Sequence, residues 1–345
     1  MSLRTPPPTF PTDDPAADLR PRLTHDDPTV RRLALIELAE WEDDQHLPWL
    51  HWALRDPDDA VRAEAAHRLV YREDTATLEA LVQALADASA RVREAAAHTL
   101  AELKETDSAV PLLAALQAPH DTQAPATPHA AFRQASLLRA LRELRATDAL
   151  APALDLAHAP DALVRREAVG VLGWLKPVQA LPTLTALAHQ DGDADVRRAA
   201  VGALGFAEGP AAPATVLQAL LTALGDPIWQ VREEAATTLA KLKPAAAQAA
   251  LLSALQDGYW QVRLRATRAL GRLKDASAVT AISLGPLRHE EANLRKEAAV
   301  ALGEIADAAA TEALLSAQLD TDPEVRKAAR MALASIEAAA AQPAR

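Results

Sequence analysis

Two histidines spaced 31 residues apart are the first candidates for chemistry in this sequence. His67 and His98 each lie close to a carboxylate, that of Glu64 or Glu94. Imidazole and carboxylate groups are common ligands of zinc and iron. If the two segments are packed helices, they stand ~8–10 Å apart, which is long for one shared metal ion. We therefore expect solvated histidines and no metal site.

Other catalytic chemistry has little basis in the residue types present. The 345-residue chain contains no cysteine, which removes thiol nucleophiles, thiolate metal sites and disulfides together. It also contains no glycine-rich phosphate loop, nucleophile elbow or hydrolase triad. We expect a protein that is not an enzyme and that carries no cofactor.

The charge and the apolar content limit the kinds of partner. There are 47 acidic and 36 basic side chains and the formal net charge is -11, which works against sequence-independent binding to nucleic acid or to an anionic membrane. No apolar run approaches the ~20 residues that span a bilayer. The start, MSLRTPPPTFPTDDP, lacks the apolar stretch of a secretory signal. These features predict a cytoplasmic protein.

A short repeat organises the whole chain. Half of the residues are hydrophobic but only 3% are aromatic, so alanine and leucine dominate and helix is favoured. An apolar residue followed by arginine recurs ten times, twice in the degenerate forms Phe132-Arg133 and Leu294-Arg295. The other eight pairs begin at Val30, Val61, Val92, Val164, Val196, Val231, Val262 and Val325.

Each copy predicts a helix, a turn and a second helix. With the apolar residue of the pair as position 0, the second helix has small residues at +4 and +5 and an apolar residue near +8, as at Ala235, Ala236 and Leu239. Apolar residues upstream, between -14 and -7, predict the first helix. An aspartate is common at position -5, where it is predicted to cap the second helix and to lie beside an arginine of the neighbouring copy. The arginines then form a charge ladder inside the stack.

The copies resemble a known family. The segments DPDDAVRAEAAHRLV, DGDADVRRAAVGALG and DTDPEVRKAARMALASI look like HEAT-like repeats of the short type first associated with phycobilin lyases. This resemblance implies an all-α fold, an α-solenoid that stacks about ten helical hairpins. Most of the family are protein-binding scaffolds, and a few are bilin lyases or base-excision enzymes. HEAT-repeat hydroxylases need several His-Glu dyads to bind a di-iron centre. This sequence has a single dyad, His289-Glu290, so we do not expect that enzyme class.

The repeat boundaries predict one solenoid over residues 15–337. A proline-rich, poorly ordered leader covers residues 1–14, an inserted loop lies near 118–130, and a tail covers 338–345, with fraying after Ile336. Trp49 and Trp52 stand at positions where other copies have small or polar residues. We expect them to pack under the leader, with a partner site as the alternative.

A doubled motif, WQVR, marks the candidate binding site. Positions -2, +2, +6 and +10 form one ridge of the second helix, on the concave face of such a solenoid. Only the seventh and eighth copies have tryptophan at -2, Trp229 and Trp260. The fifth and sixth copies have aromatics at +10 and glycine, Gly170 or Gly202, at +6, which is expected to open room. Between these rims lie charged residues, including Arg272 and Lys296.

The sequence therefore favours a monomeric scaffold or assembly factor that binds another protein on an aromatic-edged groove. Aromatic and arginine side chains most often anchor interfaces. The first alternative is a bilin-binding protein or lyase, with Arg265 or Arg268 holding the propionates. A second is a DNA-base-excision type of HEAT-like protein, against which the acidic net charge argues. The predicted partner-binding residues are Trp229, Gln230, Tyr259, Trp260, Gln261, Trp174, Phe206, Arg265 and Arg268.

Overall fold

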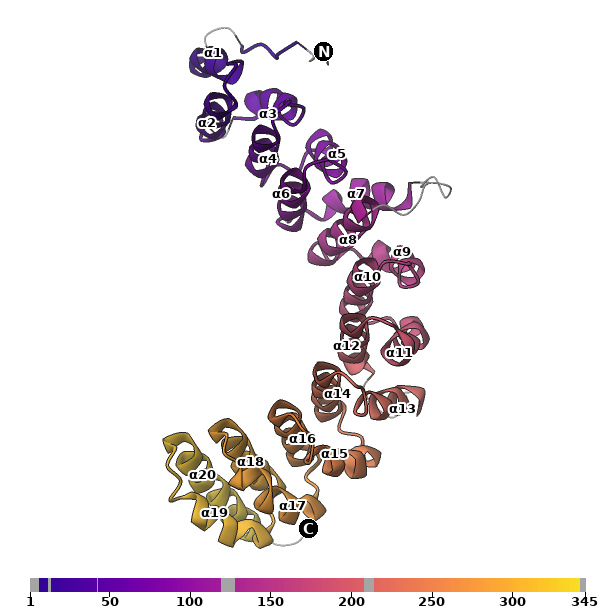
Figure 1. The fold of residues 1–345 in the computed structure, drawn as a ribbon, viewed down its shortest axis with the longest axis vertical. Helices are drawn as coiled ribbons and strands as arrows, with labels where there is room; N and C mark the ends of the chain where they lie inside the picture. Colours follow the sequence, from indigo (N-terminus) through magenta and orange to yellow (C-terminus); the bar gives the residue numbers. More distant parts are fainter. Residues whose placement is uncertain (1–5, 12–13, 42, 119–127, 208–213, 342–345) are drawn as a thin grey trace. The chain divides into compact units, whose positions relative to one another are not determined.

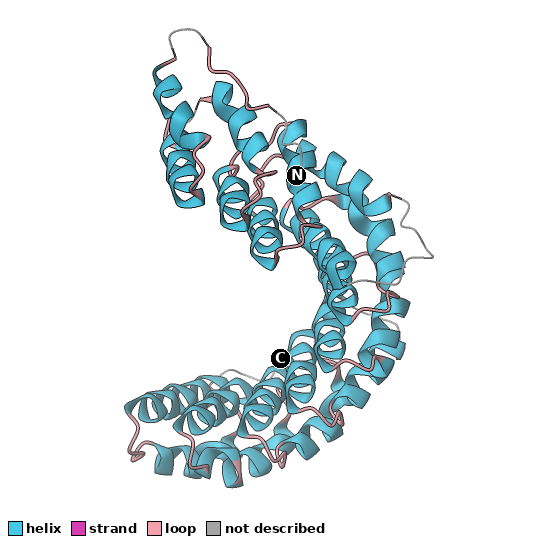
Figure 2. Cartoon of the chain, turned by 45° about the horizontal axis from the view of Figure 1, so that its top comes forward, coloured by secondary structure: helices cyan, strands magenta, loops and turns pink. Residues whose placement is uncertain are grey.

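The chain folds into paired helices throughout the part that the structure describes. The computed structural model describes residues 6–11, 14–41, 43–118, 128–207 and 214–341, which contain helices and turns but no strand (Figure 2). In this part of the chain no helix is both long enough and apolar enough to cross a bilayer. The helices separate into two compact units, residues 1–175 and 176–345.

The first unit contains five hairpins (Figure 1). The second helix of each hairpin carries the apolar-Arg pair, as the repeat predicts. The first helices are α1 (Arg20–Leu23), α3 (Leu47–Ala53), α5 (Thr75–Ala84), α7 (Ala109–Gln117) and α9 (Leu150–Leu156). The second helices are α2 (Pro28–Ala39), α4 (Asp59–Arg68), α6 (Ala90–Ala101), α8 (Pro128–Glu143) and α10 (Ala162–Leu175).

The second unit repeats this arrangement with five further hairpins. Its second helices lie in one row, on the inner side of the curve made by α14 to α20 (Figure 1). The first helices are α11 (Leu181–Gln190), α13 (Ala214–Ala223), α15 (Gln248–Ala254), α17 (Val279–Leu284) and α19 (Thr311–Ala317). The second helices are α12 (Ala194–Ala203), α14 (Trp229–Leu242), α16 (Trp260–Leu273), α18 (Ala292–Ile305) and α20 (Pro323–Ala340).

The predicted apolar stripe forms the core of each unit. In α14, Val231, Ala235, Ala236 and Leu239 are fully buried, and most equivalent positions are buried in the other second helices, although Val30 and Phe132 are half-buried and Arg330 is exposed. Each second helix packs on its own first helix and on the second helix of the next hairpin within its unit. Alanine at +4 and +5 permits this close packing because its side chain adds little width. The ten-copy prediction is confirmed.

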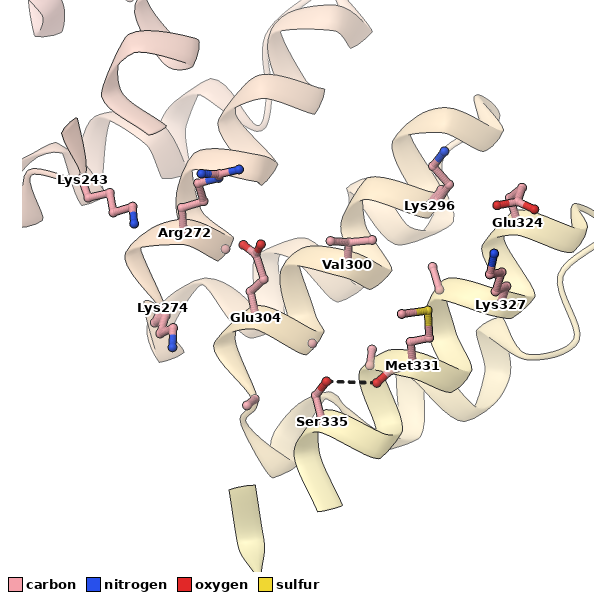
Figure 3. Close-up of a pocket in the computed structure, with 15 residues that line it drawn as sticks. Lys243, Arg272, Lys274, Lys296, Val300, Glu304, Glu324, Lys327, Met331 and Ser335 are labelled. Atoms are coloured by element: carbon pink, nitrogen blue, oxygen red, sulfur yellow. Dashed lines mark hydrogen bonds between the residues drawn. The ribbon is translucent and has the colours of Figure 1, made fainter. Parts of the chain in front are cut away.

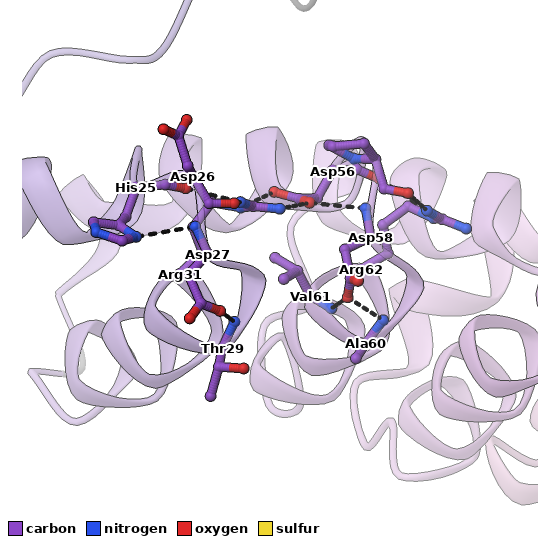
Figure 4. Close-up of polar contacts among 11 residues, drawn as sticks. His25, Asp26, Asp27, Thr29, Arg31, Asp56, Asp58, Ala60, Val61 and Arg62 are labelled. Atoms are coloured by element: carbon purple, nitrogen blue, oxygen red, sulfur yellow. Dashed lines mark hydrogen bonds and ion pairs between the residues drawn. The ribbon is translucent and has the colours of Figure 1, made fainter.

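Among the described residues, the predicted charge ladder is present in at least five of the ten layers. In the first unit, Arg31 forms two hydrogen bonds of 2.8 and 2.6 Å with the carboxylate of Asp56 in the next hairpin (Figure 4). Its remaining amino group donates to the carbonyls of His25 and Asp26 in its own turn. The same pattern recurs within the units for Arg62–Asp87, Arg197–Asp226, Arg232–Asp257 and Arg295–Asp320. Each arginine therefore ties its own turn to the following layer.

The predicted capping role of the -5 aspartate is wrong. The residue that caps the second helix lies at -3: Asp58 accepts from the amides of Ala60 and Val61, and Asp193 and Asp322 make equivalent contacts. The -5 aspartate, such as Asp56, accepts instead from the amide two residues later and from the neighbour's arginine. Two aspartates are needed because one carboxylate cannot reach both the helix end and the adjacent layer.

Part of the predicted leader contacts the first hairpins. The Phe10 ring stacks on Trp49, with centroids 4.9 Å apart. Trp49 packs edge-on against Trp52, and both indoles are buried. The prediction that these tryptophans lie under the leader is confirmed for Trp49. A hydrogen bond of 3.0 Å between His46 and Asp14 ties the end of the leader to the same place.

Two helix ends differ from the predicted boundaries. Helix α20 continues to Ala340 rather than fraying after Ile336, because the alanines that follow are strong helix formers. Helix α8 begins at Pro128, inside the predicted loop at 118–130, since proline is well tolerated in a first helical turn. Most of that loop (119–127) and most of the smaller insertion (208–213) lie outside the described residues.

Candidate functional site

The doubled WQ motif forms an exposed aromatic patch in the second unit. We define the patch as Ile228, Trp229, Tyr259 and Trp260, which lie at the starts of α14 and α16. The Trp229 ring stacks on Tyr259, with centroids 5.3 Å apart and planes 15° from parallel. The guanidinium of Arg232 lies 5.7 Å from the centre of the Tyr259 ring. Both tryptophans are half-buried, whereas Ile228 and Tyr259 are 39% and 47% exposed.

The patch occupies positions where other copies have helix caps. Ile228 and Tyr259 stand at -3, and neither side chain caps its helix. Asp58, Asp193 and Asp322 hold this position elsewhere and form capping hydrogen bonds. Replacing a capping residue with a non-capping one costs about 1 kcal/mol. The patch therefore exposes apolar side chains where a capping residue would have stabilised the helix.

A cavity of about 270 Å³ opens beside Trp260. We call it the Trp260 cavity. It is lined by four of the predicted residues, Trp260, Gln261, Arg265 and Arg268, together with Glu233, Leu264, Asn293, Lys296 and Glu297. The Oε1 atom of Gln261 is buried and has no hydrogen-bond partner in the described part of the chain. The structure thus brings these four predicted residues together between α14, α16 and α18.

The two arginines of the Trp260 cavity are already paired. Arg268 forms hydrogen bonds of 2.7 and 2.6 Å with both carboxylate oxygens of Glu297. Arg265 donates at 3.0 Å to Glu233. The bond to Glu297 raises the pKa of Arg268 above its ordinary value. Because these charges are neutralised within the fold, a bilin propionate would have to displace a carboxylate to bind them.

The other predicted site residues are more dispersed. Gln230 is half-buried next to Trp229 in α14, and Phe206 is half-buried in the 3-10 turn Leu204–Phe206. Trp174 belongs to the first unit, is 43% exposed, and has the guanidinium of Arg145 5.7 Å from its ring centre. The described contacts do not join Phe206 or Trp174 to the aromatic patch.

The expectation that two glycines open room for a ligand is wrong. A Cβ at Gly170 would lie 2.7 Å from Nη1 of Arg142, and one at Gly202 would lie 2.9 Å from Oε1 of Glu234. The space above each glycine therefore holds a charged side chain of the same unit. Partial burial raises the pKa of the Glu234 carboxyl above its ordinary value.

The histidine pair lies closer together than its helices suggested. The rings of His67 and His98 have centroids 5.9 Å apart, because the two side chains lean toward each other. No group of three or more potential metal ligands occurs among the described residues.

Sequence reasoning missed Ile228 as part of the patch, because the search was for aromatic and charged side chains. The signal that would have found it is the absence of aspartate at -3 in the two WQ copies. Reading the caps across all ten repeats shows Asp27, Asp58, Asp161, Asp193 and Asp322 at this position, so Ile228 and Tyr259 stand out together.

The stacked hairpins, with an open patch on their second helices, define an α-solenoid. HEAT repeats match residues 16–74, 55–127, 122–205, 217–284 and 283–344. The chain therefore belongs to the HEAT-repeat family. The short, phycobilin-lyase type of repeat stays a prediction, because the match is to HEAT repeats in general.

Solved structures share this fold. An engineered protein is 22% identical with a TM-score of 0.53, over 94% of this chain and 99% of its own. YibA of Escherichia coli is 18% identical with a TM-score of 0.52, over 88% and 95%. Kap95p, solved in a study of its binding to RanGDP, is 15% identical with a TM-score of 0.55, over 93% of this chain and 55% of Kap95p. No curated protein matches the sequence significantly.

Proposed function

We propose that the protein is a non-catalytic scaffold or assembly factor that binds a partner protein through the aromatic patch and the adjoining Trp260 cavity. The observation that carries this proposal is the exposure of Ile228 and Tyr259 at two helix starts where five of the other eight copies have aspartate and the remaining three have Ser89, His129 and Glu291. A substitution of this kind forgoes a helix cap and leaves apolar surface in water, a loss that the ring contacts of Tyr259 offset in one of the two copies. It is expected where the surface is needed for recognition.

The composition of the patch fits a protein interface. Tryptophan and tyrosine supply a large contact area for little loss of side-chain entropy, and they are enriched among interface anchors. The Trp229–Tyr259 stack holds both rings in place before a partner arrives. A preformed surface of this kind loses less entropy on binding than a mobile one.

The Trp260 cavity supports an anchoring role for the neighbouring residues. Its volume of about 270 Å³ is large enough for one partner side chain. The unpaired Oε1 of Gln261 is an acceptor that a donor from the partner can satisfy after a side-chain rotation. Because Arg265 and Arg268 are held by carboxylates, we assign them to shaping the wall of the cavity.

Solenoids of the same fold support a protein as the partner class. Kap95p binds the folded protein RanGDP, as the description of its structure states. For this chain the partner's identity, a monomeric state and a cytoplasmic location are parts of the proposal. The bilin alternative gains no support from the site geometry, because its two candidate arginines are already paired.

The test uses substitutions that remove the patch while restoring the caps. The double variant Ile228→Asp, Tyr259→Asp places aspartate at -3, as in Asp58 and Asp322. Each new cap contributes about 1 kcal/mol. The lost ring contacts of Tyr259 cost a similar amount. The variant should therefore be at least as stable as the wild type and should lose its partner.

The readout is affinity capture from an extract of the source cells, quantified by mass spectrometry. A matched control, Leu315→Ser with Leu319→Ser, removes two apolar side chains that are 53% and 87% exposed elsewhere in the same unit. The proposal expects the control to keep every partner that the wild type captures. Equal partner recovery by the patch variant, or loss by the control as well, would contradict it.

A further inference from the structure

The largest cavity described in the second unit lies farther along the row of second helices, between α16, α18 and α20 (Figure 3). It has a volume of about 690 Å³, and we call it the basic cavity. Seven of its lining residues stand at +2, +6 or +10 of the last three repeats, on the ridge that the sequence marked as the binding face. They are Arg272, Lys296, Val300, Glu304, Lys327, Met331 and Ser335.

Positive charge dominates this lining in a chain whose net charge is -11. Five cations, Lys243, Arg272, Lys274, Lys296 and Lys327, face two carboxylates, Glu304 and Glu324. Within the part of the chain that the structure describes, none of the five cations forms an ion pair. The basic cavity therefore differs from the Trp260 cavity, whose arginines are neutralised by the fold.

Two of the lysines stand in a strained backbone conformation. Lys243 and Lys274 end α14 and α16 with φ of 53° and 55°, in the left-handed region that glycine or asparagine adopts with less strain. Ala306 ends α18 in the same conformation, so the turn does not require a lysine. Arg145 and Lys176 have the same conformation outside this cavity, and cations are favoured at helix C-termini, so these turns place Lys243 and Lys274 at the cavity without themselves marking a ligand.

The cavity has charged ends and an apolar centre. Lys243, Arg272 and Lys274 lie toward one end, and Lys296 and Lys327 lie toward the other (Figure 3). Val300 and Met331 lie between them and are 40% and 64% exposed. Helices α16 and α18 pack closely where Gly271 lines the cavity, because a Cβ at Gly271 would lie only 2.7 Å from Cα of Ala301. An occupant that matches both features needs two acidic ends and an apolar middle.

We propose that the basic cavity binds an acidic peptide segment, with carboxylates at both ends and aliphatic side chains on Val300 and Met331. Lys296 and Glu304 are eight residues apart on α18, which places the two ends about 12 Å apart. An extended peptide covers that distance in about four residues. This binding site shares Lys296 with the Trp260 cavity but contains no residue of the aromatic patch, and it does not require the function proposed for that patch.

A peptide fits the lining better than a nucleic acid does. The lining contains no aromatic ring on which a base could stack. The exposed Val300 and Met331 offer apolar contacts that phosphates and sugars do not use.

The test measures binding of a rhodamine-labelled probe peptide, GSEDLVDEGS, to the full-length protein by fluorescence anisotropy. A neutral analogue, GSQNLVNQGS, is the peptide control. The test variant, Lys243→Asn with Arg272→Gln and Lys274→Asn, removes three cations and places asparagine in both left-handed turns, so folding should be retained. Loss of three exposed charge contacts should raise the dissociation constant of the acidic probe roughly tenfold.

A charge-matched control variant carries Lys176→Asn, Arg288→Gln and Arg330→Gln. Lys176 is also left-handed, with φ of 55°, and none of the three residues lines the basic cavity. The proposal expects this variant to bind the acidic probe within about twofold of the wild type. The patch variant Ile228→Asp, Tyr259→Asp should also keep the probe, which separates a failure here from a failure of the proposed scaffold function.

Several results would overturn the proposal. One is equal binding of the acidic and neutral peptides, and another is equal weakening by the two triple variants. Absence of probe binding to the wild type would do the same. Tighter binding of a twelve-nucleotide oligothymidylate than of the probe, lost in the test variant, would assign the cavity to nucleic acid instead.

Discussion

The substitution Arg232→Lys should destabilise the seventh repeat far more than Arg263→Lys destabilises the eighth. Arg232 and Arg263 belong to the two copies of WQVR. Arg232 donates to both carboxylate oxygens of Asp257 at 2.7 and 2.9 Å, and to the carbonyls of Asp226 and Pro227. Arg263 also donates to a carbonyl, but it forms no ion pair within the described residues.

The magnitude follows from the contacts that a lysine cannot replace. An ammonium group cannot make the parallel pair of bonds to Asp257 and still reach the carbonyls of its own turn. Hydrogen bonds to charged groups contribute about 1.5–3 kcal/mol each. Both side chains of the pair are largely buried, at 14% and 10% exposure, so solvent replaces little of the loss. Arg232→Lys should cost about 2–3 kcal/mol, and Arg263→Lys less than about 1 kcal/mol.

Hydrogen exchange followed by mass spectrometry is the suitable assay, because stacked repeats open locally rather than as one unit. Peptides covering residues 226–262 should exchange about 30- to 140-fold faster in Arg232→Lys, given tenfold for each 1.4 kcal/mol. A double-mutant cycle with Asp257→Asn should show a coupling energy of at least about 1 kcal/mol. Equal effects of Arg232→Lys and Arg263→Lys would refute the ladder as a source of stability.

Three further predictions concern stability. The hydrogen bond from Arg295 lowers the pKa of Asp320 below its ordinary value of 3.8. The stability that this pair contributes is therefore complete above pH 3.8 and is lost as the pH falls through the lowered pKa. Urea unfolding at pH 7 and pH 3 should show a smaller pH dependence for Asp320→Asn than for the wild type. Gly271→Ala should destabilise by about 1–2 kcal/mol, because crowding against α18 outweighs the gain in helix propensity, whereas Gly258→Ala, with nothing within 4 Å of the new Cβ, should change the unfolding midpoint little. Phe10→Ala should cost about 1–2 kcal/mol in the first hairpins, seen as faster amide exchange in α3, since it uncovers one face of a buried indole.

Much of the fold was accessible from spacing alone. The apolar residue of each pair, the alanines at +4 and +5 and the leucine near +8 predicted ten second helices with a common buried face, and Val231, Ala235, Ala236 and Leu239 have that burial. This worked because a hairpin in a stack contacts mainly its neighbours, so the same local pattern must satisfy the same packing in each layer.

The candidate site was less predictable. The tryptophans of the doubled motif are at accessible helix starts, and four predicted residues do line one cavity. The two arginines of the predicted groove are instead paired with Glu297 and Glu233. The spaces above its two glycines are filled by the side chains of Glu234 and Arg142. Sequence spacing gives the face on which a side chain lies, but it does not give the partner that a neighbouring layer supplies.

The sequence by itself determined the helical repeat, its register and the ridge that faces away from the buried core, because these follow from periodic burial and from the arginine and aspartate positions. Only the tertiary structure decided which charges on that ridge are neutralised and which form no ion pair within the described residues. Arg268 and Arg272 occupy equivalent faces of one helix, yet only the first finds a carboxylate in the adjacent layer. That outcome depends on side-chain distances of a few ångströms between layers.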